Sequence, residues 1–269
     1  VGNPTLGVAD IPALARSAQA RGITLVVDNT FTPMVMSPAV MGADIVVYSM
    51  TKFINGASDL IAGAICARRS FIRQLMDLHT GRAMLLGPTM DPRAAFDIIQ
   101  RIPHLAVRMR EHGRRAMAIA EHLQTWGLTV TYPGLPAFPQ HAQMRAMRNP
   151  GYGWGGMLTI DCGTQKKAEA VMDRLQNTER FDFMAVSLGY FDTLMSCSGS
   201  STSSDSATGR QVMWPACVLT PLPNPRSARS AARAATSGAG ESRRRSTTGS
   251  SRRAASASAS SRASGAASA

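Results

Sequence analysis

Long apolar runs are missing from this chain of 269 residues, and cysteine and lysine are scarce in it. No apolar segment reaches the roughly 18–20 residues that a membrane-spanning helix needs, so no membrane partner is expected. The four cysteines form no C-x-x-C pair and no histidine cluster has zinc spacing, which predicts unpaired thiols, no metal site and a reducing, cytoplasmic compartment. The chain opens with Val1 rather than Met, and we read it as a piece of a longer protein.

The charge of the chain is unevenly distributed. Its net value of +12 suggests a nucleic-acid partner, but ten arginines and only one acid lie after residue 208. Residues 1–208 hold 19 basic and 16 acidic groups, an ordinary balance for a folded protein. Nucleic-acid binding is therefore not the expected function. An Arg-rich RNA or DNA binder stays an alternative, which predicts an affinity that falls steeply with salt.

The last segment, residues 206–269, differs from the rest in composition. It ends in a stretch built almost wholly of Ala, Arg, Ser, Gly and Thr. Such a segment cannot bury enough apolar surface to offset the cost of ordering it, so we predict a disordered low-complexity tail. GC-rich coding sequence read in a wrong frame would give the same composition.

Helix and strand patterns alternate in the first part of the chain. Asp10 can cap a helix that Gly22 ends, and the apolar strand ITLVVDNT follows. IVVYS and AGAICA repeat the strand pattern. Uninterrupted apolar strands predict an α/β fold with a parallel sheet buried on both faces, whose ligands lie at the carboxyl ends of the strands. Asp28 and Ser49 both lie at such ends.

A helical pattern covers residues 91–125, with a break near Pro103. Its arginines, Arg108 among them, are expected to face solvent, opposite an apolar stripe. His112 and His122 are expected at or near the surface rather than as catalytic bases. GGMLTIDCG and DFMAVSLG then read as strands on either side of the helix KKAEAVMDRLQN, which indicates a second, smaller α/β unit.

One lysine stands out in the stretch VVYSMTKFINGASDLIAG. Lys52 is one of only three lysines in the chain, and it follows a buried strand among hydroxyls and glycines. An amine is used where a side chain must lose its proton and attack a carbonyl, which arginine cannot do. Ser49 and Thr51 offer hydroxyl donors to a phosphate, and Asp28 offers a buried carboxylate. Pyridoxal phosphate needs a Schiff-base lysine, phosphate donors and an acid facing its pyridinium nitrogen, so these residues predict that cofactor.

Several motifs make the chain resemble a known family. DNTF, YSMTKFINGASDLIAGAIC, TYPGLPAFPQH and FMAVSLGYFDTLMSCSGSSTSS are similar to the signature of the cysteine/methionine-metabolism (trans-sulfuration) enzymes that use pyridoxal phosphate, and within them to plant-type methionine γ-lyases. The resemblance covers roughly residues 1–205. It implies the aspartate-aminotransferase-like fold, fold type I. The implied organisation is the C-terminal part of a large cofactor-binding domain at 1–104, an incomplete smaller α/β domain at 105–205, and the tail.

The resemblance also implies roles for single residues. Lys52 matches the catalytic Schiff-base lysine and Asp28 the partner of the pyridinium nitrogen, while Ser49 and Thr51 match phosphate ligands. Asn3 matches a residue near the cofactor and the substrate carboxylate, and Ser187 matches one that helps hold that carboxylate.

The implied activity is that of a carbon–sulfur lyase. It would convert L-methionine by γ-elimination into methanethiol, 2-oxobutanoate and ammonia, in a homo-oligomer that is a tetramer in the family. Cystathionine γ-lyase, cystathionine γ-synthase and O-acetylhomoserine sulfhydrylase activity stay open as alternatives. So does a catalytically impaired fragment.

The chain departs from the family pattern in two places. The family's N-terminal part, with its phosphate-gripping loop, is absent. Family members also continue after the SSTSS segment to a strand whose arginine clamps the substrate carboxylate, and nothing after Asp205 matches that strand. We assign this role to none of Arg210, Arg226 and Arg229. A bidentate arginine clamp is hard to replace, so we expect weak cofactor binding and little turnover from this chain.

Overall fold

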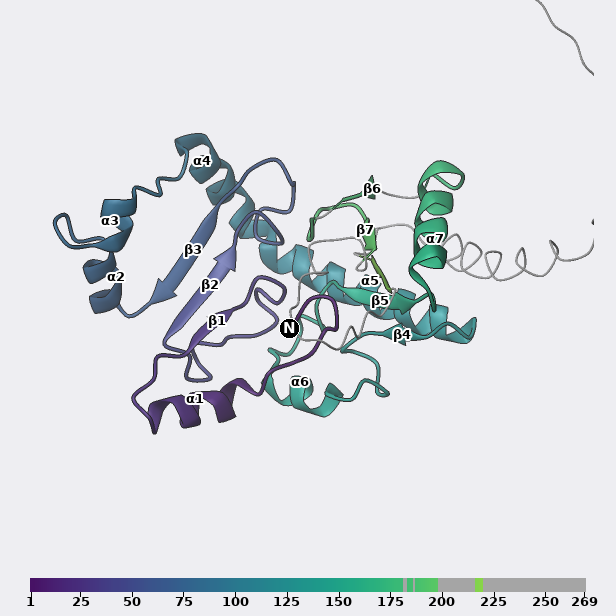
Figure 1. Cartoon of the computed structure of the whole chain (residues 1–269), viewed down its shortest axis with the longest axis horizontal. Helices are drawn as coiled ribbons and strands as arrows, with labels where there is room; N and C mark the ends of the chain where they lie inside the picture. The colour runs from purple at the N-terminus through teal and green to yellow at the C-terminus, as the bar shows by residue number, and fades with distance from the viewer. Residues whose placement is uncertain (181–182, 186, 198–215, 220–269) are drawn as a thin grey trace, which may run out of the picture.

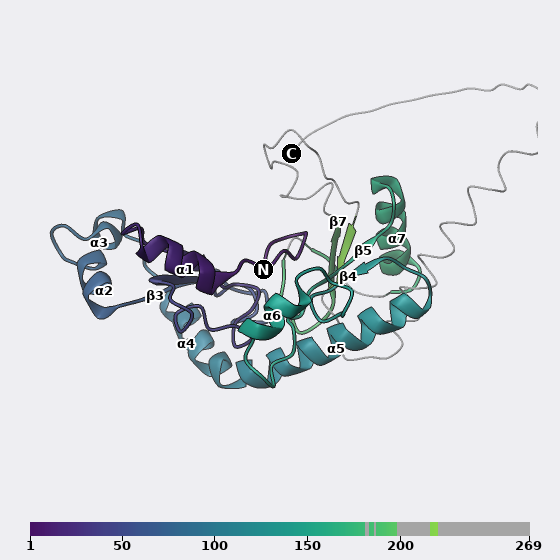
Figure 2. The ribbon, with the colours of Figure 1, turned by 90° about the horizontal axis from the view of Figure 1, so that it is seen from below.

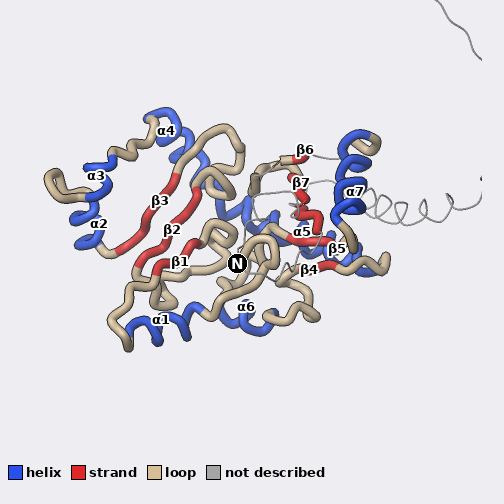
Figure 3. Tube along the Cα trace, viewed as in Figure 1, coloured by secondary structure: helices blue, strands red, loops and turns tan. Residues whose placement is uncertain are grey.

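The computed structural model describes residues 1–180, 183–185, 187–197 and 216–219 of the chain. Two groups of strands lie side by side, each with helices against it, as Figure 1 shows by element and Figure 3 by secondary structure. No helix among the described residues is both long and apolar enough to cross a bilayer.

The first sheet has three strands in the order β1-β2-β3. β1 (Val26–Asp28) pairs in parallel with β2 (Ile45–Ser49), and β2 pairs antiparallel with β3 (Gly63–Ala67). The expectation of a parallel sheet is therefore correct for β1 and β2 and wrong for β3. The segment that follows Ser49 is a chain of turns rather than a crossover helix, so the chain reverses and returns antiparallel.

The helix before this sheet follows the sequence prediction. α1 (Ile11–Gln19) begins after Asp10, whose carboxylate accepts a hydrogen bond from the amide of Ala13 at 2.9 Å. Gly22 takes a left-handed conformation (φ 63°) just beyond the helix, which a residue without Cβ adopts at little cost.

The strands of the first sheet are less buried than their apolar sequences predict. Ile45 and Val46 of β2 are buried, but Val26 of β1 is 53% exposed and Ile65 of β3 is 49% exposed. The prediction that both faces are covered is wrong for β1 and β3, because these side chains remain about half exposed to solvent. The same holds for Asp28, which was expected to be buried and is exposed.

A run of helices leads from the first sheet to the second. They are α2 (Arg69–Leu75), α3 (Arg82–Leu86), α4 (Pro92–Arg101), the 3-10 turn η1 (Ile102–His104) and α5 (Leu105–Thr125). The predicted break near Pro103 is confirmed as η1, since proline lacks the amide that an α-helix interior needs. Figure 2 shows α5 running beneath both halves of the molecule.

The second sheet has five strands in the order β4-β5-β8-β7-β6. Its strands are β4 (Val130–Thr131), β5 (Leu158–Asp161), β6 (Phe183–Met184), β7 (Leu194–Cys197) and β8 (Ala216–Leu219). β6 pairs in parallel with β7, and the other pairs are antiparallel. Two further helices belong to this half, α6 (His141–Met147) and α7 (Gln165–Asn177). The strands and helix predicted for 157–185 are thus confirmed where the structure describes them.

Strand β8 corrects the prediction for the tail. Ala216–Leu219 pairs with both β5 and β7, so four residues of the segment expected to be disordered lie inside the sheet. Ala-Cys-Val-Leu is a short apolar segment of the kind that completes a sheet interior, unlike the Arg- and Ser-rich sequence after it. The rest of the predicted tail lies outside the described residues.

Two hydrophobic cores form, and α5 contributes to both. Its first turns supply Leu105 and Met109 to the core beside the first sheet, and its later turns supply Ala116, Ala120 and Leu123 to the core of the second sheet. These five side chains form the apolar stripe of the helix, and all of them are buried. The domain boundary between residues 104 and 105 stays a prediction, because this single helix joins the two cores.

Candidate active site

The parallel pairing of β1 and β2 brings Asp28 and Ser49 to one edge of the first sheet. Asp28 is in register with Val47, two residues before Ser49. Thr30 links the two strand ends: its amide donates to Asp28 Oδ1 at 2.8 Å, and its hydroxyl oxygen accepts from the amide of Ser49 at 2.8 Å. Within the part of the chain that the structure describes, no hydrogen bond reaches Asp28 Oδ2, so this oxygen can accept from another donor. The edge therefore presents a carboxylate and a serine beside each other.

Lys52 lies on a tight turn directly after β2. The amide of Asn55 donates to the carbonyl of Met50 and the amide of Gly56 to the carbonyl of Lys52, both at 2.8 Å. Gly56 has φ 76°, a conformation that glycine adopts without strain. We refer to residues 50–56 as the lysine turn.

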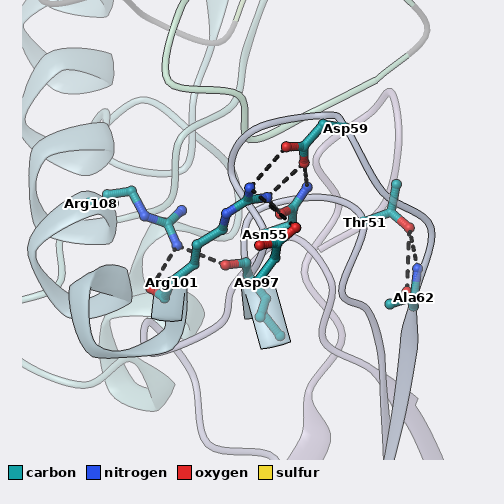
Figure 4. Close-up of polar contacts among 8 residues, drawn as sticks. Thr51, Asn55, Asp59, Ala62, Asp97, Arg101 and Arg108 are labelled. Carbon is teal, nitrogen blue, oxygen red and sulfur yellow. Dashed lines mark hydrogen bonds and ion pairs between the residues drawn. The ribbon is translucent and has the colours of Figure 1, made fainter. Parts of the chain in front are cut away.

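The hydroxyl of Thr51 is engaged within the protein. It accepts from the amide of Ala62 at 3.0 Å and donates to the carbonyl of the same residue at 3.3 Å. Figure 4 shows the pair beside the start of β3. Its single O–H is thus committed to main chain, and a role as phosphate donor would require the side chain to rotate.

Lys52 and Ser187 meet although 135 residues separate them. The lysine Nζ lies 3.5 Å from Ser187 Oγ. The contact is supported two residues later, where Gly189 packs against main chain of Phe53, so closely that a Cβ on the glycine would stand 2.6 Å from Phe53 N and Cα. The segment 187–189 therefore lies directly on the lysine turn.

Asn3 is exposed near the start of the chain, and its peptide bond to Pro4 is cis. The hydrogen bonds of the described residues do not join Asn3 to Lys52 or Ser187.

Of the six site residues expected from the sequence, Lys52 and Ser187 are in direct contact, and Asp28 and Ser49 share the neighbouring strand edge. Thr51 is next to Lys52, but its hydroxyl is turned to Ala62. Asn3 lies apart from these contacts.

Arg108 was assigned to the solvent face of its helix, and this is wrong. Its guanidinium is half-buried and donates to the carbonyls of Phe53 and Ile54, at 2.6 and 2.7 Å. Burial lowers its pKa, and the charge of Arg101 acts in the same direction. Arg108 directly precedes the buried Met109 and so lies at the edge of the apolar stripe. This position is the feature of the sequence that could have indicated partial burial.

His112 is also more buried than expected, at 6% exposure. It packs edge-to-face on Phe53, with the ring centroids 5.4 Å apart. Burial lowers its pKa to about 4, and the charges of Arg108 and Arg115 act in the same direction against that of Glu111. The imidazole is therefore neutral near pH 7 and forms part of the packing beneath the lysine turn.

The strand that completes the second sheet carries no arginine. Its sequence is Ala-Cys-Val-Leu, and it lies between β5 and β7. Arg210, Arg226 and Arg229 lie outside the described residues. Among the described residues, no hydrogen bond or ion pair joins an arginine to Lys52 or to Ser187.

Comparison with known proteins identifies the family that the sequence motifs resemble. The sequence profile described as "Cys/Met metabolism PLP-dependent enzyme" matches residues 1–212. The chain is 57% identical over 205 residues to the methionine gamma-lyase of Arabidopsis thaliana, covering 76% of this chain and 46% of that protein. It is 36% identical over 197 residues to the L-methionine gamma-lyase of Pseudomonas deceptionensis, covering 71% and 47%.

The fold is that of a solved enzyme. The crystal structure of cystathionine gamma synthase from Xanthomonas oryzae pv. oryzae, in complex with aminoacrylate and cysteine, superposes with a TM-score of 0.76 at 30% identity, covering 90% of this chain and 62% of that one. The fold type expected from the sequence is thus confirmed. The chain spans about half the length of the curated relatives that it matches.

Proposed function

The chain belongs to the family of Cys/Met metabolism PLP-dependent enzymes, and from this premise we propose that the protein is a carbon–sulfur lyase that uses pyridoxal 5'-phosphate. It cleaves L-methionine by γ-elimination and releases methanethiol, 2-oxobutanoate and ammonia. The observation that carries the proposal is the contact of Lys52 Nζ with Ser187 Oγ beside the strand edge of Asp28 and Ser49. The 57% identity to a methionine gamma-lyase supports methionine as the substrate.

The residues at this edge fit the cofactor in chemical type. Lys52 would hold it covalently through Nζ, and Asp28, with Oδ2 available, would accept a hydrogen bond from its ring nitrogen. Ser49 would donate to its phosphate, and Thr51 would join it only by releasing Ala62. When bound, the cofactor supplies an electron-withdrawing ring that stabilises negative charge on the substrate α-carbon.

The side chains of this protein would then handle the substrate and its protons. Once the substrate amine has displaced it from the cofactor, the Lys52 amine in its uncharged form would take the proton from the α-carbon, because an ammonium ion cannot act as a base. Ser187 orients this amine through the contact at 3.5 Å and, with Asn3, would donate hydrogen bonds to the substrate carboxylate.

Other activities of the same family are the second candidate. Cystathionine γ-lyase, cystathionine γ-synthase or O-acetylhomoserine sulfhydrylase activity is favoured by the resemblance in fold to a cystathionine gamma synthase. A catalytically impaired fragment is the third, favoured by the absence of arginine from β8. We further propose a cytoplasmic homo-oligomer that acts on small amino acids and does not bind nucleic acid.

Borohydride trapping tests the cofactor site directly. The purified chain is mixed with pyridoxal phosphate, reduced, digested and mapped by mass spectrometry, beside the variant Lys52→Arg and the control Lys166→Arg on α7. We expect a phosphopyridoxyl group on Lys52 in the unsubstituted chain and in the control. Equal labelling of the Lys52→Arg variant, or a phosphopyridoxyl group found only on other residues, would contradict the proposal.

Product analysis separates the candidate activities. Methanethiol and 2-oxobutanoate are measured with L-methionine and, in parallel, with cystathionine and O-acetylhomoserine. We expect methionine to be the preferred substrate of a full-length version and turnover by this chain to be slow. A full-length version that consumes only cystathionine would move the assignment to the second candidate.

A further inference from the structure

Two main-chain carbonyls in the middle of the lysine turn accept hydrogen bonds from a side chain of another element. Phe53 and Ile54 directly follow Lys52, and their carbonyl oxygens accept from the two terminal nitrogens of Arg108, at 2.6 and 2.7 Å. Arg108 lies on α5, more than fifty residues later in the sequence. One planar guanidinium thus holds the carbonyls of the two residues that follow the lysine.

A second arginine holds the residues that follow these carbonyls, Asn55 and Asp59. Arg101 forms a bidentate ion pair with Asp59, with nitrogen–oxygen distances of 2.7 and 2.9 Å, and also donates to the amide oxygen of Asn55. Asn55 is 2% exposed and donates to Asp59 in turn, at 3.1 Å. Figure 4 shows both arginines, from η1's two flanking helices, reaching the loop. Arginines of α4 and α5 therefore hold residues 53–55 and Asp59.

Gly56 makes room for Arg108. A Cβ at this position would stand 2.9 Å from the central carbon of the guanidinium, and closer still to one of its nitrogens. The left-handed conformation of Gly56 (φ 76°) also closes the turn. The glycine thus allows both the turn and the close approach of the arginine.

Placing the guanidinium of Arg108 in this half-buried position costs free energy. Desolvation disfavours a half-buried cation, and among the described residues Arg108 forms no ion pair with a carboxylate. Arg101, whose carbonyl accepts from Arg108 at 3.5 Å, adds like-charge repulsion. What the guanidinium gains in return is its pair of hydrogen bonds to the lysine turn.

The turn is also confined from its other side. Gly189 packs on the main chain of Phe53, and Ser187 contacts Lys52 Nζ. The main chain of Phe53, the residue after Lys52, therefore has Gly189 against its N and Cα and the guanidinium of Arg108 on its carbonyl. A shift of this main chain would move the lysine relative to Ser187.

We propose that Arg108 is a positioning residue for Lys52, which holds the lysine turn through the carbonyls of Phe53 and Ile54 so that Nζ meets both Ser187 and the cofactor aldehyde. The proposal rests on the proposed function for the role of Lys52. Lysine at position 108 cannot replace arginine, because an ammonium group lacks the rigid fork that reaches two carbonyls at once.

Amide hydrogen exchange on the whole chain tests the hold on the turn. The variants are Arg108→Ala and Arg108→Lys, and the control is Arg114→Lys, on the same helix but exposed and paired with Glu111. The reporters are the amides of Asn55 and Gly56, which close the turn. We expect them to exchange about tenfold faster or more in both Arg108 variants, as loss of hydrogen bonds to a charged group implies, while amides of α7 keep their rates.

Chemical rescue separates a positioning role from general destabilisation. Guanidinium ion, far below denaturing concentrations, should restore slow exchange and the yield of borohydride-trapped phosphopyridoxyl-Lys52 in Arg108→Ala but not in Arg108→Lys, whose side chain fills the site. A yield in the Ala variant equal to that of the unsubstituted chain would overturn the positioning role alone. If even the unsubstituted chain gave no adduct at Lys52, the proposed function would fail and the positioning role with it.

If Arg108→Ala is unfolded, as a loss of its helical circular dichroism would show, the Arg108→Lys variant tests the proposal by the same two measurements, amide exchange and adduct yield. Unchanged exchange at Asn55 and Gly56 together with an unchanged adduct yield would then refute the proposal. Faster exchange confined to the turn, with a reduced yield, would support it.

Discussion

The α-carbon of Gly189 lies against the main chain of Phe53, so that a Cβ on the glycine would stand 2.6 Å from two backbone atoms. Phe53 follows the candidate cofactor lysine, and Gly189 follows Ser187 by two residues. The close approach therefore brings the second half of the chain onto the turn that carries Lys52, and no residue other than glycine fits there without displacement of main chain.

Gly189→Ala should destabilise the protein by about 3 kcal/mol, since it combines a left-handed conformation (φ 75°) with a clash against backbone. Gly163→Ala is the matched control: its φ is 76°, but nothing lies within 4 Å of the added Cβ. The control should cost only about 1 kcal/mol. Urea unfolding of both variants gives the comparison, and equal losses would show that the contact with Phe53 is not tight.

His112 should make stability depend on pH. Its pKa is lowered to about 4 in the folded protein, from 6.5 in the unfolded chain, so the unfolded state binds the extra proton between these values. The stability tied to the neutral imidazole is complete above pH 6.5 and is lost as the pH falls from 6.5 to 4, by about 3 kcal/mol at most. The free energy of unfolding, measured from pH 7 to pH 4, should fall less steeply in His112→Gln than in the unsubstituted chain.

The exposed His79 supplies the control for this titration. His79→Gln should keep the steep fall, because this substitution leaves the buried imidazole of His112 in place. Carboxylates of the unfolded chain also bind protons near pH 4. In the folded protein, the ion pairs of Glu111 and Asp59 hold the pKa values of these two groups at about 2, so they too lower the stability as the pH falls. Only the difference between the two histidine variants therefore reports on His112. Parallel curves would contradict the buried, neutral imidazole.

The sequence was sufficient for the parts of the fold that local patterns control. The apolar strand before Ser49, the cap at Asp10 and the break at Pro103 each depend on neighbours within a few residues. Lys52 stood out for a similar reason, because an amine after a buried strand has few structural uses. Its role stays a prediction, and so does that of Ser187, whose Oγ lies 3.5 Å from the lysine Nζ.

The features that the sequence did not reveal depend on distant parts of the chain. Strand β8 takes its place between β5 and β7 through pairing partners far away in sequence, and its four residues stand in a segment of unpromising composition. Arg108 was assigned to solvent because helical periodicity shows which face is apolar, not which carbonyls a residue at the edge of that face can reach. Asp28 was expected to be buried because an apolar strand does not reveal which of its faces is covered.

Thr51→Val should loosen the start of β3. The substitution removes the hydroxyl that accepts from the Ala62 amide and donates to its carbonyl, at a cost of about 1 kcal/mol. Thr51→Ser keeps the hydroxyl and serves as the control. Hydrogen exchange at the Ala62 amide should quicken in the valine variant and stay slow in the serine variant. If both exchange alike, the hydroxyl does not hold this amide.

Asp28→Asn should separate cofactor binding from stability. The Asp28 side chain is exposed, and asparagine can still accept from the Thr30 amide through its side-chain oxygen, so the free energy of unfolding should change by less than about 0.5 kcal/mol. A neutral amide cannot stabilise a protonated ring nitrogen as a carboxylate does, and the yield of phosphopyridoxyl-Lys52 should therefore fall. Asp173→Asn, exposed on α7, should change neither quantity. A full yield of adduct in Asp28→Asn, with unfolding also unchanged, would show that the carboxylate at the end of β1 does not face the cofactor.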